Sequence, residues 1–392
     1  MSLKLDKRHW KKVSLGAIAA ASKERVDLSD GSVKRFVAGE HMETDNLQIQ
    51  RWGDVGEVYV GPAFHRRFHA GQVLYGSRRT YLRKVAVADF DGVCANTTFV
   101  VEAKDKGVLL QDFLPLIMIA EPFHAFAMTV SKGSVNPYVN WSDIERYEFE
   151  LPPLDEQKRI ADLLWSIEHH GRAKGREAAS VGRVRQSFID SFLHHVASVY
   201  PIERLDALTT RIADGVHQRP SYTEDGIPFL TVENLTRSDG IDFGDVRYVP
   251  RSDHEVFIRR AHPERGDVLV SKDGTLGVAR VVETEAEFSI FVSIAVLKPR
   301  SDVLLPHYLR AYFDSGHFKS VLAAKTSGSA LKHIHLVDFR AMQVPVPPIE
   351  AQRAFVAELG VISASLEALG EEAVRLHGTK GALLAEIFRG AN

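Results

Sequence analysis

Two stretches of the chain place apolar residues at helical spacing, and both begin in the same way. Each opens on a proline pair, Pro152-Pro153 or Pro347-Pro348, followed by an acidic residue, as is typical of a helix N-terminus. An apolar stripe with the period of an α-helix then follows. The residues of the two stripes are Ile160, Leu163, Leu164 and Ile167, and Phe355, Leu359, Ile362 and Leu366. The pattern predicts two long helices, within residues 151–199 and 346–392.

These stretches belong to an internal repeat with a constant offset of 195 residues. Gln157 corresponds to Gln352, and Asp143 corresponds to Asp338. Upstream, the segment Gly71-Gln-Val-Leu lies over Gly266-Asp-Val-Leu at the same offset. An ungapped register of this length predicts a tandem duplication, in which each copy contains one globular region and one long helix.

The remaining pattern is short and mixed. Strand-like runs such as Thr97–Val101 alternate with short helical segments, so residues 1–150 and 200–345 are predicted to form two α+β globular regions. A helix of roughly forty residues spans about 60 Å and needs a partner along its length. We therefore predict that the two long helices pair as an antiparallel coiled coil. The alternative is that each helix packs only on its own globular region.

Composition adds few constraints. The chain has 392 residues, 45% of them hydrophobic, which is ordinary for a globular protein of two or three domains. The formal net charge of −2 predicts no bulk attraction to nucleic acid, so any anion-binding face must be local. One cysteine, Cys94, excludes an intramolecular disulfide and favours a reducing compartment. No stretch has the length of a membrane span or the composition of a secretion signal, so a cytoplasmic location is expected.

One local basic region stands out between Gly61 and Ala88, where no acidic residue occurs. Tyr75 and Tyr81 are interleaved with its basic residues. These are Arg66, Arg67, Arg78, Arg79, Arg83 and Lys84. This composition is typical of a surface for a phosphate backbone, with arginines able to read guanine edges. The alternative is a solvated basic loop.

The repeat supplies a second signal. Residues 122–142 and 315–337 contain no Asp or Glu and overlap at the 195-residue offset. Each holds small residues beside lysine: Lys132 and Ser134 in the first copy, and Lys325, Ser327 and Lys332 in the second. Backbone amides and hydroxyls on such loops can approach phosphate closely. Equivalent anion-facing loops are therefore predicted in both copies.

Catalytic patterns are weaker. Asp91, Glu102 and Lys104 fit a metal-dependent nuclease spacing loosely, but the second copy has no such residues at the equivalent positions. Asn136-Pro-Tyr138 is a fragment of an amino-methyltransferase motif without its second proline, and no glycine-rich cofactor loop follows a strand. Four pairs of histidines lie close together in the sequence, but none has a third ligand at the spacing of a metal site. They are His65 and His69, His169 and His170, His194 and His195, and His333 and His335. No catalytic residue, metal or cofactor is predicted, although a single-chain nuclease or methyltransferase and a pure protein scaffold remain alternatives.

The repeated motifs resemble the DNA-specificity subunits of type I restriction-modification systems. The resemblance rests on the Gly71 and Gly266 turns, on Pro152-Pro-Leu-Asp-Glu-Gln157 and its second copy, and on Asp273-Gly-Thr-Leu-Gly277. It implies two target-recognition domains, 1–150 and 200–345, that each read half of a split, asymmetric site in double-stranded DNA. It also implies that the helices act as a spacer and that the chain is not itself an enzyme.

The same resemblance implies protein partners: two methyltransferase subunits that dock on this chain, and translocating nuclease subunits that join them. We expect the first DNA surface to comprise Arg66, Arg67, Arg78, Arg79, Lys84, Lys132 and Ser134. We expect the second to comprise Lys272, Thr275, Lys325, Ser327 and Lys332. Arg78-Arg79 stand where the second copy has Asp273-Gly274, so the two halves are not expected to be equivalent.

Overall fold

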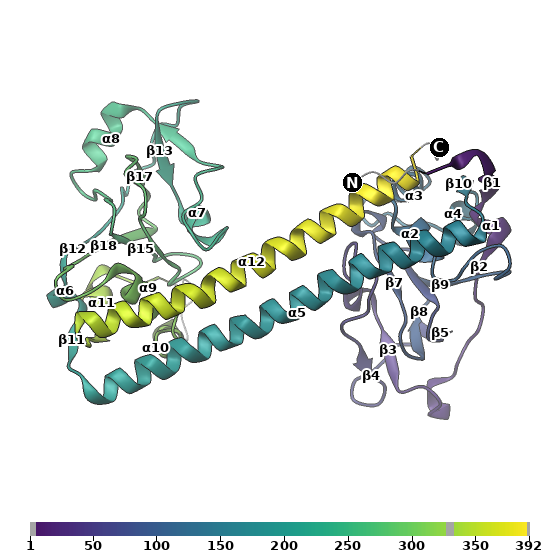
Figure 1. Ribbon diagram of the computed structural model, residues 1–392, viewed down its shortest axis with the longest axis horizontal. Coiled ribbons are helices and arrows are strands. Elements are labelled where there is room, and N and C mark those ends of the chain that lie inside the picture. The colour runs from purple at the N-terminus through teal and green to yellow at the C-terminus, as the bar shows by residue number, and fades with distance from the viewer. Residues whose placement is uncertain (1–4, 327–332, 390–392) are drawn as a thin grey trace. The chain divides into compact units, whose positions relative to one another are not determined.

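The computed structural model describes residues 5–326 and 333–389, which form two compact units. Unit 1 comprises Met1–Gly175 and Glu371–Asn392, and unit 2 comprises Arg176–Gly370. The boundaries fall inside the two long helices, α5 (Leu154–Val199) and α12 (Ile349–Ile387) (Figure 1). Each unit therefore holds part of both helices. No described helix is long and apolar enough to cross a membrane.

Unit 1 combines two four-stranded sheets, with strand orders β2-β9-β6-β7 and β4-β3-β8-β5, and a β1-β10 pair. Its strands are β1 (Lys11–Ser14), β2 (Ala19–Ala21), β3 (Arg35–Val37), β4 (Gly53–Asp54), β5 (Phe64–Phe68), β6 (Val73–Gly76), β7 (Val85–Val87), β8 (Gly92–Ala95), β9 (Thr98–Ala103) and β10 (Glu148–Leu151). Its helices are α1 (Leu15–Ile18), α2 (Leu114–Ile119), α3 (Glu121–Thr129) and α4 (Trp141–Ile144), with 3-10 turns η1 (Lys7–His9), η2 (Leu28–Asp30), η3 (Gly39–His41) and η4 (Thr80–Leu82).

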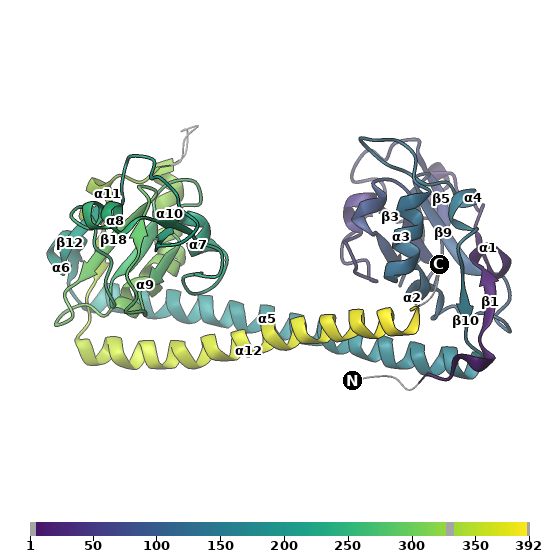
Figure 2. The same cartoon turned by 90° about the horizontal axis from the view of Figure 1, so that it is seen from above.

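Unit 2 has sheets of order β12-β18-β15-β16 and β14-β13-β17, and a β11-β19 pair. Its strands are β11 (Ile202–Arg204), β12 (Thr209–Asp214), β13 (Ile227–Leu230), β14 (Arg247–Val249), β15 (Val268–Ser271), β16 (Ala279–Val281), β17 (Ser289–Ile290), β18 (Ile294–Pro299) and β19 (Gln343–Pro345). Its helices are α6 (Leu205–Leu208), α7 (Val232–Thr236), α8 (Arg251–Phe257), α9 (Pro306–Asp314), α10 (Gly316–Thr326) and α11 (Leu336–Ala341). These elements lie to one side of the unit's helix pair (Figure 2).

The predicted tandem repeat and α+β class are confirmed by the matching sheets. The order β2-β9-β6-β7 in unit 1 is the order β12-β18-β15-β16 in unit 2, and Gly71 and Gly266 both make their turns at φ +89°. The structure also pairs strands that the sequence pattern could not. The parallel pair β13-β17 of unit 2 matches the parallel pair β3-β8 of unit 1, although the two chain segments have no visible sequence likeness.

The long helices pair in antiparallel fashion, as predicted. In unit 1, Lys380 Nζ lies 2.6 Å from Glu168, and Lys174 Nζ lies 3.5 Å from Glu372. Residue numbers thus rise along α5 while they fall along α12. Burial raises the pKa of Glu168, but the cations of Lys380 and Arg172 outweigh it and hold that pKa below its ordinary value. The carboxylate therefore stays ionised between the helices.

In unit 2 the same pairing is both polar and aromatic. Arg185 Nε donates to Ser363 Oγ at 3.1 Å, and the rings of Phe192 and Phe355 stack with centroids 4.1 Å apart. Arg185 and Ser363 are the 195-offset equivalents of Lys380 and Glu168. Cross-helix polar contacts thus occur at equivalent places in both units.

The predicted apolar stripes also serve the globular cores. Ile160 and Leu164 are buried with α1, α2 and β9 residues, and Phe355 and Leu359 are buried with β15 and α9 residues. The other stripe members are half-buried: Leu163, Ile167, Ile362 and Leu366. The prediction that the two helices pair is therefore confirmed, and each helix also packs on a globular region.

A buried glutamine fixes the start of each long helix. Gln157 Oε1 accepts from Leu110 N–H at 2.9 Å, and its amide donates to the carbonyls of Val108 and Pro152. Gln352 repeats all three bonds with the residues at the 195-residue offset, Leu305, Val303 and Pro347. Both glutamines are almost fully buried. Each one satisfies three backbone groups that would otherwise be buried without partners.

We predict that Gln157→Leu and Gln352→Leu each destabilise one unit by about 2–4 kcal/mol, because leucine matches the volume but leaves these backbone groups unpaired. Hydrogen exchange should show faster exchange around Leu110 in the first variant and around Leu305 in the second. The exposed Gln50→Leu is the control. Equal protection in the variants and the native chain would contradict a stabilising role for these amides.

Candidate nucleic-acid interface

The structure brings the two sequence signals of the first copy together in unit 1. The loop after β6 and the loop before α4 lie side by side: Val139 N–H donates to Ser77 O at 3.0 Å, and Arg79 Nε donates to Asn136 Oδ1 at 2.9 Å. Arg78 and Tyr138 form an isolated backbone bridge between the same loops. We call these segments, residues 77–83 and 131–139, the unit 1 loop pair.

The unit 1 loop pair exposes both cations and aromatic rings. Arg78, Arg79, Lys132 and Ser134 are all exposed, and Tyr81 and Tyr138 retain 47% and 40% of their surface. Arg79 adopts a left-handed φ of 50°, which is uncommon for a residue with a Cβ. Exposed arginines beside exposed tyrosines can hold phosphate and stack on bases.

One cation of the loop pair is partly neutralised. Lys132 Nζ lies 2.8 Å from Asp143, which also accepts from the backbone N–H and side-chain amide of Asn140 and lies 3.7 Å from Arg146. The lysine and these hydrogen bonds hold the pKa of Asp143 below its ordinary value. Half of the Lys132 side chain still reaches solvent. Asp143 therefore orients Lys132 at the base of the loop without removing it from the surface.

The other predicted cations of unit 1 lie outside the loop pair. Arg66 donates to the carbonyl of Thr98 at 3.1 Å, and Arg67 faces Glu24 at 3.5 Å. Lys84 Nζ donates to the carbonyl of Gly39. All three are half-buried. The stretch from Gly61 to Ala88 thus does not form one continuous basic face.

Arg83 has a structural role. It donates to the carboxylates of Asp45 and Glu121 and to the carbonyl of Ile119, so it ties three segments of unit 1 together. Burial lowers the pKa of Arg83, but the two carboxylates outweigh it and raise the pKa above its ordinary value. Its charge is therefore committed within the protein.

Unit 2 repeats the loop framework with different side chains. Ile334 N–H donates to Lys272 O at 2.9 Å, as Val139 N–H does to Ser77 O in unit 1. Asp273 and His333 form an isolated backbone bridge, as Arg78 and Tyr138 do in unit 1. Thr275 is exposed, as expected. Of the other residues predicted for this surface, Ser327 and Lys332 lie outside the described residues, as does the side chain of Lys325.

Lys272 is not placed where we expected it. The residue is only 3% exposed, and its ammonium lies 3.5 Å from Asp214 and 3.4 Å from Asp273. Asp214 is also buried and binds Arg260 at 2.5 Å. Burial raises the pKa of Asp214, but Arg260 and His217 outweigh it and lower that pKa. Lys272 therefore belongs to an internal ion cluster. The sequence analysis did not predict its contact with Asp214, because the two residues are far apart along the chain.

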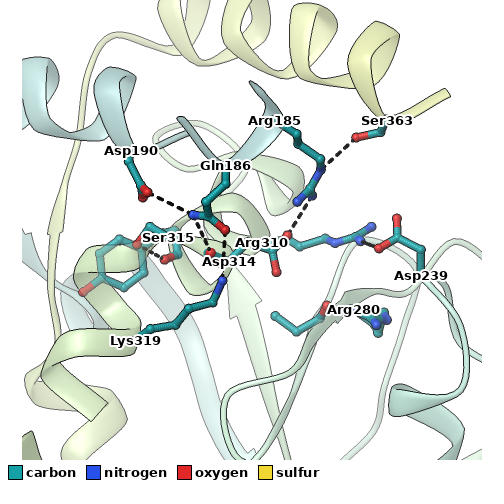
Figure 3. Close-up of polar contacts among 12 residues, drawn as sticks. Arg185, Gln186, Asp190, Asp239, Arg280, Arg310, Asp314, Ser315, Lys319 and Ser363 are labelled. Carbon is teal, nitrogen blue, oxygen red and sulfur yellow. Dashed lines mark hydrogen bonds and ion pairs between the residues drawn. The ribbon is translucent and has the colours of Figure 1, made fainter. Parts of the chain in front are cut away.

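A second polar network anchors α9 and α10 to the helix pair of unit 2 (Figure 3). Arg185, on α5, lies 2.8 Å from Asp314 at the end of α9, and Gly316 N–H donates to Asp190 at 2.7 Å. Arg310, on α9, pairs with Asp239. The network positions the corner between α9 and α10 next to the long helices.

The weak nuclease pattern does not form a catalytic cluster. Asp91 accepts from His69 at 3.0 Å, Glu102 accepts from Gln72 at 2.7 Å, and Lys104 donates to the carbonyl of Gly16. Each side chain is thus engaged with a different neighbour. Among the described residues, no group of three His, Cys, Asp or Glu side chains has the arrangement of a metal site.

Asn136 and Tyr138 also belong to the loop pair, although the sequence pattern did not place them on the predicted DNA surface. By sequence, Asn136-Pro-Tyr138 matches only a fragment of a methyltransferase motif. The signal was present, because both residues lie inside the acid-free stretch 122–142. The contact with Arg78 and Arg79 is what gives them a place in the loop pair.

Comparison with known proteins agrees with this architecture. Residues 8–171 match the family described as the type I restriction modification DNA specificity domain. The resemblance read from the sequence motifs is thereby confirmed. The repeated α+β regions and long helices extend the likeness beyond the matched residues.

Three particular proteins show the extent of the likeness. The EcoDI specificity subunit of Escherichia coli is 30% identical over 124 residues, which are 32% of this chain and 27% of that protein. The EcoKI specificity subunit of E. coli K12 is 23% identical over 289 residues, 66% of this chain and 61% of its own. This chain thus matches less than two thirds of either relative. The S subunit of a type I system from M. genitalium has the same fold, with 15% identity, complete coverage of both chains and a TM-score of 0.62.

We predict that Lys272→Met destabilises unit 2 by about 1–3 kcal/mol, because the buried carboxylate of Asp214 then loses the buried cation beside it. Hydrogen exchange of the β15 and β18 amides measures this loss. Arg219→Met, which removes an exposed charge from the same unit, should change protection by less than about 0.5 kcal/mol. An unchanged β15 in Lys272→Met would show that the lysine is not needed inside the protein.

Proposed function

We propose that this chain is the sequence-specific DNA-recognition subunit of a type I restriction-modification complex. The globular regions 1–150 and 200–345 act as target-recognition domains, and each reads one half of a bipartite, asymmetric site in double-stranded DNA. The observation that carries the proposal is the equivalent loop framework in the two units, with Arg78 and Tyr138 in one and Asp273 and His333 in the other. A common scaffold with different tips suits two readers of different sequences.

The long helices, within residues 151–199 and 346–392, set the separation of the half-sites and provide docking surfaces for two methyltransferase subunits. The restriction subunits, which carry the translocase and nuclease, join that assembly. The chain contributes no catalytic group of its own, works without a cofactor and acts in the cytoplasm. The continuous helix α5, which connects the two globular regions, supports the spacer role.

Within the unit 1 surface, Arg78 and Arg79 are the leading candidates for base or phosphate contacts, with Lys132 and Ser134 beside them. Arg66, Arg67 and Lys84 are secondary, because they lie outside the loop pair and are half-buried. Thr275 is the exposed candidate of the second DNA surface. Lys325, Ser327 and Lys332 are retained as candidates from the sequence alone. Lys272 is left out of this surface because of its burial.

We predict that Arg78→Ala with Arg79→Ala weakens cognate DNA binding by the reconstituted complex at least tenfold. A base-reading arginine contributes about 1–3 kcal/mol, and each lost phosphate contact lowers the salt slope by about one. Fluorescence anisotropy over a salt series measures both quantities. The matched control is Arg8→Ala, in an exposed arginine outside the loop pair. Native affinity and an unchanged salt slope in the double variant would remove these residues from the interface.

The spacer role has a separate test. Gly171 packs against Leu376, so inserting four residues after each of them lengthens both helices by about one turn and keeps their pairing. We predict that the methylated site gains a longer non-specific gap while both half-sites stay the same. Sequencing of methylated DNA from cells with the complete system reads this directly. An altered half-site with the original gap would refute the spacer role.

A further inference from the structure

A cavity of about 620 Å³ lies beside the edge strand β2 in unit 1. Ala19, Ala20 and Ala21 of β2 line one part of it, and Phe99 and Trp141 line another part. Phe99 and Trp141 meet edge to face, with centroids 6.0 Å apart. The space beside the alanines is thus bounded by aromatic surface.

The charge around this cavity is strongly positive. Four cations line it: Lys23, Arg25, Arg66 and Lys104. Glu145 is the single carboxylate in the lining. In the described part of the chain, none of the four cations forms an ion pair with a carboxylate. Their charge is therefore available to an anion that enters the cavity.

Arg66 is already oriented for such a ligand. One of its terminal nitrogens donates to Thr98 O at 3.1 Å, and its guanidinium carbon lies 5.4 Å from the Phe99 ring centroid. These contacts hold the planar group in place, while Nε and Nη2 have no protein acceptor among the described residues. A fixed guanidinium with free N–H groups is suited to bidentate contact with phosphate.

Unit 2 shows that the fold does not require these residues. The positions equivalent to Arg66, Lys104, Trp141 and Glu145 hold Ala261, Pro299, Leu336 and Arg340. Arg340 donates instead to the carbonyl of Ile212 on the edge strand β12, at 3.3 Å. Arg66, Lys104 and Trp141 are therefore not repeated in unit 2 at the 195-residue offset, which argues for a ligand and not for a scaffold role.

We propose that this cavity binds one nucleotide unit. Arg66 holds the phosphate, with Lys23, Arg25 and Lys104 around it, and the base stacks on Trp141 above the alanines of β2. Base stacking on an aromatic ring contributes about 1–3 kcal/mol per base. The site is distinct from the unit 1 loop pair, and it does not depend on the function proposed above.

Isothermal titration of the full chain with deoxyadenosine monophosphate and with inorganic phosphate tests this site. The nucleotide should bind at one site per chain and more tightly than phosphate. Arg66→Lys keeps the positive charge but loses the paired N–H donors of the planar guanidinium, so it should weaken the binding of both ligands about tenfold. Trp141→Leu, which introduces the residue of unit 2, should weaken the nucleotide about tenfold and leave phosphate within about twofold. The surface variant Lys158→Gln is the control.

Competition with duplex DNA shows whether the nucleotide that this site binds is part of a DNA strand or a free nucleotide. Displacement of the mononucleotide by DNA assigns the site to a nucleotide of the bound strand, whereas simultaneous binding assigns it to a free nucleotide. The proposal is overturned if folded Arg66→Lys and Trp141→Leu bind the nucleotide like the native chain, or if the native chain binds none. Retention of nucleotide binding by the Arg78→Ala, Arg79→Ala variant distinguishes this site from the unit 1 loop pair.

Discussion

Neither globular region completes its hydrophobic core without both long helices. The core of unit 1 takes Ile160 and Leu164 from the start of α5 and Leu384 and Ile387 from the end of α12. The core of unit 2 takes the opposite ends of the same helices, including Ile189 and Phe355. Burial of these side chains links the folding of each unit to the helix pair, because an exposed stripe on either helix would be costly.

This exchange of helix ends gives the polar contacts between the helices their importance. Apolar seams tolerate sliding, whereas buried charges and amides accept only one register. Glu168 with Lys380 in unit 1, and Ser363 with Arg185 in unit 2, occupy equivalent positions of the duplicated sequence. The pairs differ chemically, so the two units have diverged even in the contacts that align their helices.

The loop pairs show the same separation between framework and surface. The bond from Val139 N–H to Ser77 O recurs in unit 2 as Ile334 N–H to Lys272 O, and the Arg78–Tyr138 bridge recurs as Asp273–His333, while the side chains are different. In unit 1 the tips carry arginines and tyrosines. In unit 2 a buried lysine and two aspartates occupy the base of the loop. A rigid framework with variable tips lets a duplicated domain change what it binds without changing how it folds.

The sequence by itself determined the duplication, the α+β class, the long helices and their antiparallel pairing, because all four follow from periodicity and a constant offset. It could not match β13-β17 to β3-β8, because that likeness exists only in strand pairing. Nor could it show that Arg78 and Tyr138 meet or that Lys272 is buried beside Asp214. Those contacts join residues more than fifty positions apart, and burial depends on neighbours that only the folded chain supplies. Local pattern thus fixed the elements, and tertiary packing decided which charges reach the surface.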